Sequence, residues 1–167
     1  MARYRSAVDD AEREKLTELF RARFKVTPLH QLLGLQIVET EDGSVMVEMP
    51  VAEPAFNQTG NLHGGAIATL IDVVGGSTAA RAAAFKPGEN TLVTADLHVR
   101  YLGRPKGDWV RGQGTVLHAG RSLIVVEVKV TDTENRVIAS ADFSSMVVSL
   151  RQPLREVAEA DVRAPDM

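Results

Sequence analysis

The residues best suited to chemistry in this 167-residue chain lie in one stretch, from Asn57 to Asp72. His63, Gly64 and Gly65 stand inside it, and Asp72 is the only charge among the apolar and small residues from 66 to 80. An unpaired carboxylate in apolar surroundings is costly, so Asp72 needs a reason to be there. It is either a structural carboxylate held by hydrogen bonds, or a catalytic base or nucleophile.

The glycine pair Gly64-Gly65 also has two interpretations. Backbone N–H groups without side chains, at the positive end of a helix dipole, can form an oxyanion hole. Alternatively, the two glycines let the helix start pack closely against a strand. His63 beside them either caps the helix or hydrogen-bonds a substrate.

These residues must be positioned by a helix, which the sequence predicts from Ala66 to Ala84. A helix that is apolar on all sides is typical of a buried helix, so we expect a sheet to wrap around it. Gly64 and Asp72 are roughly 12 Å apart along such a helix, too far to act on one carbonyl. If both are catalytic, the site needs two copies of the chain related by a two-fold axis.

The sheet is predicted from alternating segments on both sides of this helix. Two segments before it, Leu35–Thr40 and Ser44–Val51, suit a hairpin that turns at Glu41-Asp42-Gly43. Four segments follow the helix and favour an antiparallel sheet, namely Thr91–Leu102, Trp109–His118, Leu123–Thr131 and Val137–Val148. In the first of these four, simple alternation places Val93, Ala95, Leu97, Val99 and Tyr101 on one face and Thr94, Asp96, His98 and Arg100 on the other.

The ends of the chain are expected to add little chemistry. Residues 8–25 have the apolar spacing of an amphipathic helix, and Thr27 is expected to cap a short helix, Pro28–Leu33, that Gly34 ends. Gly75-Gly76 inside the long helix is expected to pack closely against another helix or a strand, including the helix of a partner subunit. We predict one domain, with an N-terminal helical extension at 1–27, a core at 28–149 and a tail at 150–167.

Composition excludes several function classes. The chain has no cysteine, and its four histidines show no metal-ligand spacing, so we expect no metal site. A net charge of -3 and 25% charged residues are typical of an ordinary soluble protein. We therefore expect a cytoplasmic protein that binds neither nucleic acid nor membrane.

The pattern Asn57-x5-His63-Gly64-Gly65-x6-Asp72, followed by strands, resembles the hotdog-fold acyl-CoA thioesterases. The resemblance is to the PaaI-like (phenylacetic acid degradation) branch of the 4-hydroxybenzoyl-CoA thioesterase superfamily, and it extends over about residues 29–148. It implies an α+β hotdog fold at 28–149, with an antiparallel sheet wrapped around a long central helix, to which this chain adds an N-terminal helix.

The resemblance also implies an activity: hydrolysis of an acyl-CoA thioester to a free carboxylic acid and CoA, at a site shared across a homodimer. In that family the dimers commonly pair again into tetramers. The Gly64 N–H would polarise the thioester carbonyl, and Asp72 of the other subunit would attack it or activate water. His63 and Asn57 would orient substrate and water, and Thr94 would hold Asp72 or the water. From residue type alone, a loop asparagine such as Asn57 more often forms a turn than binds a ligand, and Thr94 suits a strand at least as well as a site.

In the resembling family, two turns meet coenzyme A, which is part of the substrate, so no separate cofactor is expected. The corresponding candidates here are Tyr101, Arg104, Lys106, Gly120, Arg121 and Ser122. Arg121 is the strongest of them because a guanidinium can hold phosphate in a bidentate way.

The sequence leaves two other functions open. One is an enoyl-CoA hydratase-like hotdog enzyme, and the other is a non-catalytic module that binds acyl-CoA or lipid. Neither the acyl group nor its length is predicted.

Overall fold

The computed structural model describes residues 10–40, 44–83 and 89–150, with side chains of the first helix described from residue 17 onward. Its helices are α1 (Asp10–Val26), α2 (Pro28–Leu32) and α3 (Gly64–Ala82). Its strands are β1 (Gln36–Val38), β2 (Met46–Pro50), β3 (Asn90–Tyr101), β4 (Trp109–Ala119), β5 (Leu123–Asp132) and β6 (Val137–Ser149). Each predicted helix and strand is present with shifted ends. The predicted turn at 41–43 and the tail from 151 lie outside the described residues.

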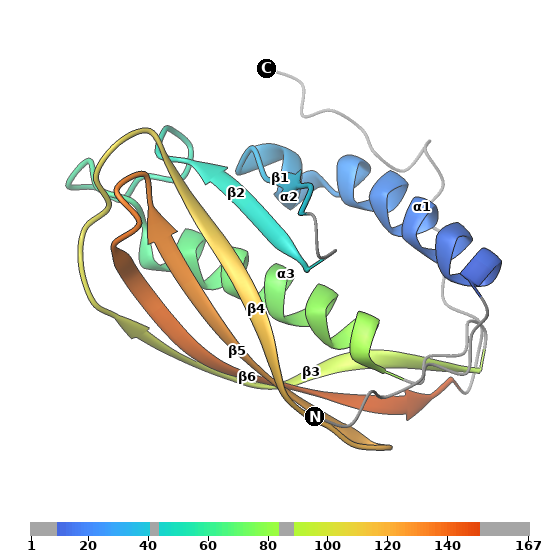
Figure 1. Ribbon diagram of the computed structural model, residues 1–167. Coiled ribbons are helices and arrows are strands. Elements are labelled where there is room, and N and C mark those ends of the chain that lie inside the picture. The colour runs from blue at the N-terminus through green and yellow to red at the C-terminus, as the bar shows by residue number, and fades with distance from the viewer. Residues whose placement is uncertain (1–9, 41–43, 84–88, 151–167) are drawn as a thin grey trace.

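The strands form one six-stranded sheet in the order β1-β2-β4-β5-β6-β3, and every neighbouring pair is antiparallel. The sheet curves around α3, which lies along one of its faces (Figure 1). This is the hotdog arrangement, with α1 as an additional N-terminal helix. The strands β1 and β3 are the two edges of the sheet, so β3 has one side without a partner strand among the described residues.

The central helix is buried on the side that faces the sheet. Leu70, Ile71 and Val74 are completely buried, whereas Asp72 and Val73 are half-buried. The expectation that the helix is buried all round is therefore wrong for a single chain. A sheet on one side of a helix cannot cover the opposite side.

Close packing between α3 and the sheet depends on glycines. A Cβ atom on Gly75 would lie 2.5 Å from the ring of Phe143 on β6, and one on Gly114 of β4 would lie 2.2 Å from Oγ1 of Thr78. Gly75 thus packs closely against a strand of its own chain, which is one of the packing partners expected from the sequence. Gly76 points elsewhere, because the nearest atom to its Cβ position is 4.0 Å away.

A β-bulge in β3 changes which of its residues face the helix. The pairing of β3 with β6 shifts register between Thr94 and Asp96, and Leu92 and Leu97 both pack against the core. One extra residue reverses the alternation, so even-numbered residues face the helix before the bulge and odd-numbered residues after it. The predicted alternation is therefore wrong at its start, since Thr94 lies on the helix side with Leu97 and Val93 does not.

The N-terminal helices attach to the domain through Phe24, which is 4% exposed. The ring of His30 lies 4.4 Å from that of Phe24, centroid to centroid, and burial lowers the pKa of His30. Thr27 precedes α2 but does not cap it, because its hydroxyl donates to the Arg23 carbonyl instead. Gly34 follows α2 with a positive φ of 64°, as expected of a helix-ending glycine.

We predict that Gly75→Ala destabilises the fold by about 1–3 kcal/mol, because its methyl group would overlap the buried Phe143 ring. Gly76→Ala is the matched control, since it adds the same methyl group one position away in open space. It should leave stability unchanged or raise it by up to about 1 kcal/mol through helix propensity. Urea unfolding at one protein concentration measures both, and equal losses would contradict the packing described here.

Candidate active site

The first turn of α3 presents a free backbone donor. His63 is the N-cap, and its Nδ1 accepts a hydrogen bond of 2.8 Å from Gly65 N. The His63 carbonyl accepts from Ala66 N at 3.0 Å. The Gly64 N–H has no partner among the described residues, and it stands at the positive end of the α3 dipole. The structure thus shows His63 as a cap, and its capping role leaves the Nε2–H of the neutral ring free to donate.

Tyr101, at the end of β3, lies over this helix start. Its hydroxyl donates to the Gly64 carbonyl at 3.0 Å, and a Cβ on Gly64 would lie 3.4 Å from the ring. Gly64 therefore combines both expected features, an open N–H and a close approach to a strand. Tyr101, which the resemblance places at CoA, therefore lies beside the residue that is expected to be the oxyanion donor.

Asn57 organises the loop that leads into α3. Its side-chain Oδ1 accepts hydrogen bonds from Thr59 N (2.9 Å), Thr59 Oγ1 (2.7 Å) and Asn61 N (3.2 Å). The oxygen is therefore occupied by turn formation, which agrees with the interpretation of Asn57 as a turn-forming residue. Only the amide Nδ2 of Asn57 is left to donate to another group.

Asp72 lies on the half-exposed side of α3, facing β3. Thr94 Oγ1 donates to Asp72 Oδ1 at 3.0 Å. This contact exists because the bulge turns Thr94 toward the helix. The other carboxylate oxygen of Asp72 has no partner among the described residues, so this carboxylate is only partly satisfied within its own chain.

The candidate residues therefore form two separate groups along one edge strand. Tyr101 and Gly64 meet at one end of β3, and Thr94 and Asp72 meet near the other. Because α3 is a continuous helix, Gly64 and Asp72 stay roughly 12 Å apart. The chain does not bring its expected oxyanion donor and its expected carboxylate together.

The expected CoA contacts are also divided within one chain. The loop with Arg104 and Lys106 precedes β4, and the turn with Gly120, Arg121 and Ser122 follows it. A strand of 11 residues separates the two groups, which is roughly 33 Å.

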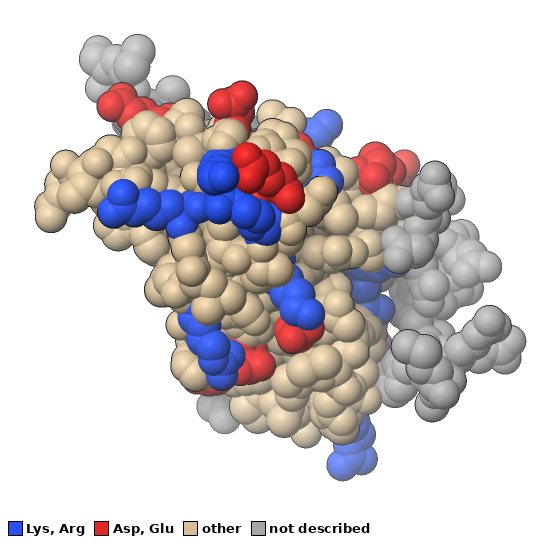
Figure 2. Space-filling view, turned by 60° about the vertical axis from the view of Figure 1, so that its left-hand side comes forward, with Lys and Arg blue, Asp and Glu red and all other residues tan. Residues whose placement is uncertain are grey.

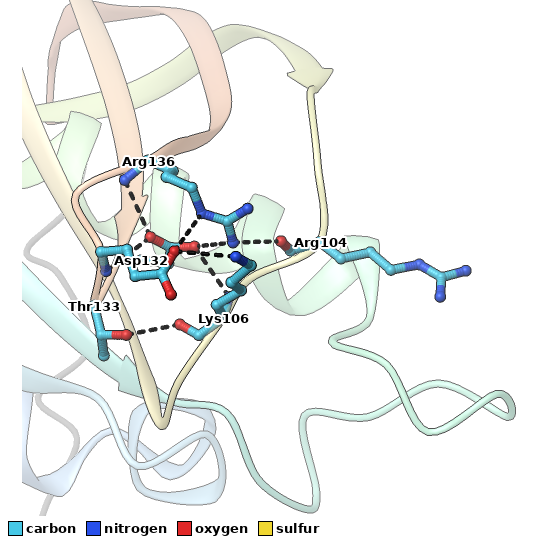
Figure 3. A network of polar contacts seen from close by, with 6 residues as sticks. Arg104, Lys106, Asp132, Thr133 and Arg136 are labelled. Atoms are coloured by element: carbon cyan, nitrogen blue, oxygen red, sulfur yellow. Dashed lines mark hydrogen bonds and ion pairs between the residues drawn. The ribbon is translucent and has the colours of Figure 1, made fainter.

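The loop before β4 is tied to the β5–β6 turn by a buried acid that sequence reasoning missed (Figure 3). Asp132 is completely buried and accepts hydrogen bonds of 3.0 Å from Lys106 N, Glu134 N and Arg136 N, together with one of 2.5 Å from Arg136 Nη2. Burial alone would raise the pKa of Asp132, but these hydrogen bonds lower it to about 2. The sequence signal at this position was the turn at Asp132–Asn135, which looks like an ordinary hairpin turn and does not indicate that Asp132 is buried.

The end of the molecule that carries this loop is seen in Figure 2, where basic side chains lie next to acidic ones on a largely uncharged surface. Within the described ranges there is no group of three His, Asp or Glu side chains placed to hold a metal ion. None of the helices that the structure describes is long and apolar enough to span a membrane.

The chain is similar to known proteins in sequence and in structure. The profile of the thioesterase superfamily matches residues 59–139. An esterase candidate of Halobacterium salinarum is 35% identical, over 61% of this chain and 68% of its own. Human acyl-coenzyme A thioesterase 13 is 30% identical, over 71% of this chain and 84% of its own. A Bacillus halodurans protein solved with CoA superposes with a TM-score of 0.67 at 26% identity, covering 87% of this chain and 99% of that one.

Proposed function

Since this chain belongs to the thioesterase superfamily, we propose that it hydrolyses acyl-CoA thioesters at a site that two subunits share. The observation that carries the proposal is the pair of incomplete half-sites along the free edge of β3. Within the described part of the chain, the Gly64 N–H and one carboxylate oxygen of Asp72 have no partner, and one helix keeps them apart.

Antiparallel pairing of two copies of β3 would join the half-sites. Tyr101 covers Gly64, and Thr94 contacts Asp72, so placing Tyr101 opposite the partner's Thr94 brings Gly64 to the partner's Asp72. Residues directly opposite each other in an antiparallel pair point to the same face. The bulge meets this condition, because it puts both Thr94 and Tyr101 on the helix side.

The same pairing fixes where the two-fold axis passes. Tyr101 lies opposite the bulge of the partner strand. The next residue inward, Arg100, then lies opposite the partner's Asp96, and Val99 lies opposite the partner's Leu97. His98 then lies opposite its own copy, at the axis. On this register each dimer holds two equivalent sites, one at each end of the paired strands.

The proposed chemistry starts at the thioester carbonyl. Its oxygen accepts a hydrogen bond from Gly64 N–H, where the α3 dipole stabilises developing negative charge. The partner's Asp72 takes a proton from water as the water oxygen bonds to the carbonyl carbon. The C–S bond then breaks, and the proton passes to the departing thiolate, which gives the carboxylic acid and CoA thiol. In the alternative route a carboxylate oxygen of Asp72 bonds to the carbonyl carbon and the C–S bond breaks, which forms a mixed anhydride and releases CoA thiolate. Water then hydrolyses the anhydride, which gives the carboxylic acid, restores the Asp72 carboxylate and supplies the proton of the CoA thiol.

The other candidates take supporting roles in this proposal. Thr94 holds one oxygen of Asp72, so the other oxygen is aimed at the reaction. His63 and Asn57 orient substrate or water through the donors that capping and turn formation leave free, namely Nε2–H and Nδ2.

Pairing of β3 also gathers the CoA candidates. Leu123, next to the second turn, lies opposite Met146 of β6, and Met146 lies opposite Val93 of β3. This turn is thus level with the start of β3, where the partner's Tyr101 and its following loop would arrive. The loop with Arg104 and Lys106 of one subunit would then face Gly120, Arg121 and Ser122 of the other. Arg104 and Arg121 would supply the positive charge for the phosphates of CoA.

We predict that Asp72→Asn and Asp72→Ala each lower thioester hydrolysis at least about 100-fold, since both remove the base or nucleophile. Release of free thiol from a panel of aryl and aliphatic acyl-CoA thioesters measures the loss and identifies the acyl class. Asp142→Asn, an exposed carboxylate on β6, is the matched control and should retain activity. If wild type hydrolyses no thioester, or the Asp72 variants match it, the proposal fails.

The proposed axis can be tested with a single thiol, because the chain has no cysteine of its own. His98→Cys should form a covalent dimer on mild oxidation, since opposite residues of antiparallel strands have Cα atoms about 5 Å apart. Asp142→Cys is the control, because Asp142 lies beside His98 but one strand further from the edge. Non-reducing electrophoresis shows the result, and equal cross-linking of both variants, or of neither, would contradict this register.

A further inference from the structure

Asp132 is the only charged side chain that is completely buried in the part of the chain that the structure describes. A buried carboxylate is unfavourable unless donors surround it, and here each of its two oxygens accepts from at least one backbone N–H. Three backbone N–H groups and one guanidinium serve this single group. The proposed hydrolysis does not use Asp132, so the arrangement needs another explanation.

The hydrogen bonds around Asp132 connect the β5–β6 turn to the loop that follows β3. Lys106 N donates to Asp132, and the Lys106 carbonyl accepts from Thr133 Oγ1 at 2.8 Å. Arg136 Nη2 donates to the Arg104 carbonyl at 3.3 Å. At Gly107, with φ of 80°, a Cβ would lie 2.0 Å from Thr133 Oγ1, so the loop backbone lies directly against the turn. The loop is held at each of these points.

The charged side chains at this loop and turn differ in whether they form ion pairs. Lys106 Nζ pairs with Glu134 Oε2 at 3.2 Å, so its charge is already compensated. Arg136 pairs with Asp132 and Glu134. The guanidinium of Arg104 has no ion pair among the described residues, and Figure 3 shows it extending away from the network. Among the residues that the structure describes, the fixed backbone of this loop therefore carries one cation without an ion pair, the guanidinium of Arg104.

Resting on the acyl-CoA hydrolase function proposed above, we propose that Asp132 and Arg136 form a clamp that positions Arg104 against a phosphate of CoA. Asp132 is then a positioning residue, and preference for CoA over thioesters that lack the nucleotide depends on it. An arginine on a fixed backbone loses less conformational freedom on binding than one on an unrestrained loop. Lys106, by contrast, contributes to the clamp rather than to the ligand.

The test compares kcat/KM for an acyl-CoA with kcat/KM for the same acyl group on pantetheine, which lacks the nucleotide and its phosphates. Arg104→Gln should lower this ratio about tenfold, as expected for the loss of a charge-assisted contact. Asp132→Asn should lower the ratio severalfold. In the double variant, Asp132→Asn should cause no further fall, because Asp132 acts through Arg104.

Two further variants complete the test. Thr133→Val removes the hydrogen bond to the Lys106 carbonyl without changing a charge, so it should also lower the ratio, and it decides the question if Asp132→Asn does not fold. Glu127→Gln is the control, since Glu127 is also on β5 and pairs with Lys129 away from the loop.

The clamp is overturned if Asp132→Asn and Thr133→Val slow both thioesters equally, since a merely structural role would leave the ratio unchanged. It is also overturned if Asp132→Asn lowers the ratio by the same factor with and without Arg104. A wild-type protein that hydrolyses neither thioester would instead remove the hydrolase function itself.

Discussion

The fixed length of an α-helix is the constraint on which this structure depends. Gly64 begins α3 and Asp72 lies two turns further on, so no side-chain movement can bring the two to one carbonyl. Both residues nevertheless contact the same edge strand, which lacks a neighbour on its outer side among the described residues. The separation of the two candidate groups by one helix and the presence of a strand edge that can pair with its own copy are both explained by the site that we propose, which two chains build.

The bulge in β3 makes this solution geometrically consistent. Without the extra residue, Thr94 would point away from α3 and could not hold Asp72. With it, Thr94 and Tyr101 share a face and can lie opposite each other across an antiparallel pair. A local irregularity of one strand thus serves both the contact within the chain and the proposed contact between chains. The Asp132 network is also a local arrangement with a proposed second use. It fixes the backbone of the loop after β3 and leaves the Arg104 side chain without an ion pair among the described residues.

Much of the fold could be predicted from the sequence. The apolar run with a single Asp72 indicated the central helix, and alternating segments indicated the strands, because hydrophobic periodicity depends only on neighbouring residues. The bulge could not be predicted, since it exists through the register between β3 and β6. The burial of Asp132 could not be predicted either, because it results from a loop 26 positions away in the sequence. Asn57 suits both a turn and a site, and only its three hydrogen bonds show that its oxygen is occupied.

Mixing two inactive variants tests the shared site most directly. Gly64→Pro removes the N–H that we propose as the oxyanion donor and should keep the helix, because proline is tolerated at the first helical position and His63 before it is already extended, with φ of −69° and ψ of 134°. Gly64→Ala keeps the N–H and is its control. When Gly64→Pro and Asp72→Asn subunits are exchanged in equal amounts, half of the dimers are mixed, and each holds one intact site. The account predicts about a quarter of wild-type thioester hydrolysis from this mixture. No recovery on mixing would show that Gly64 and Asp72 do not meet across the dimer.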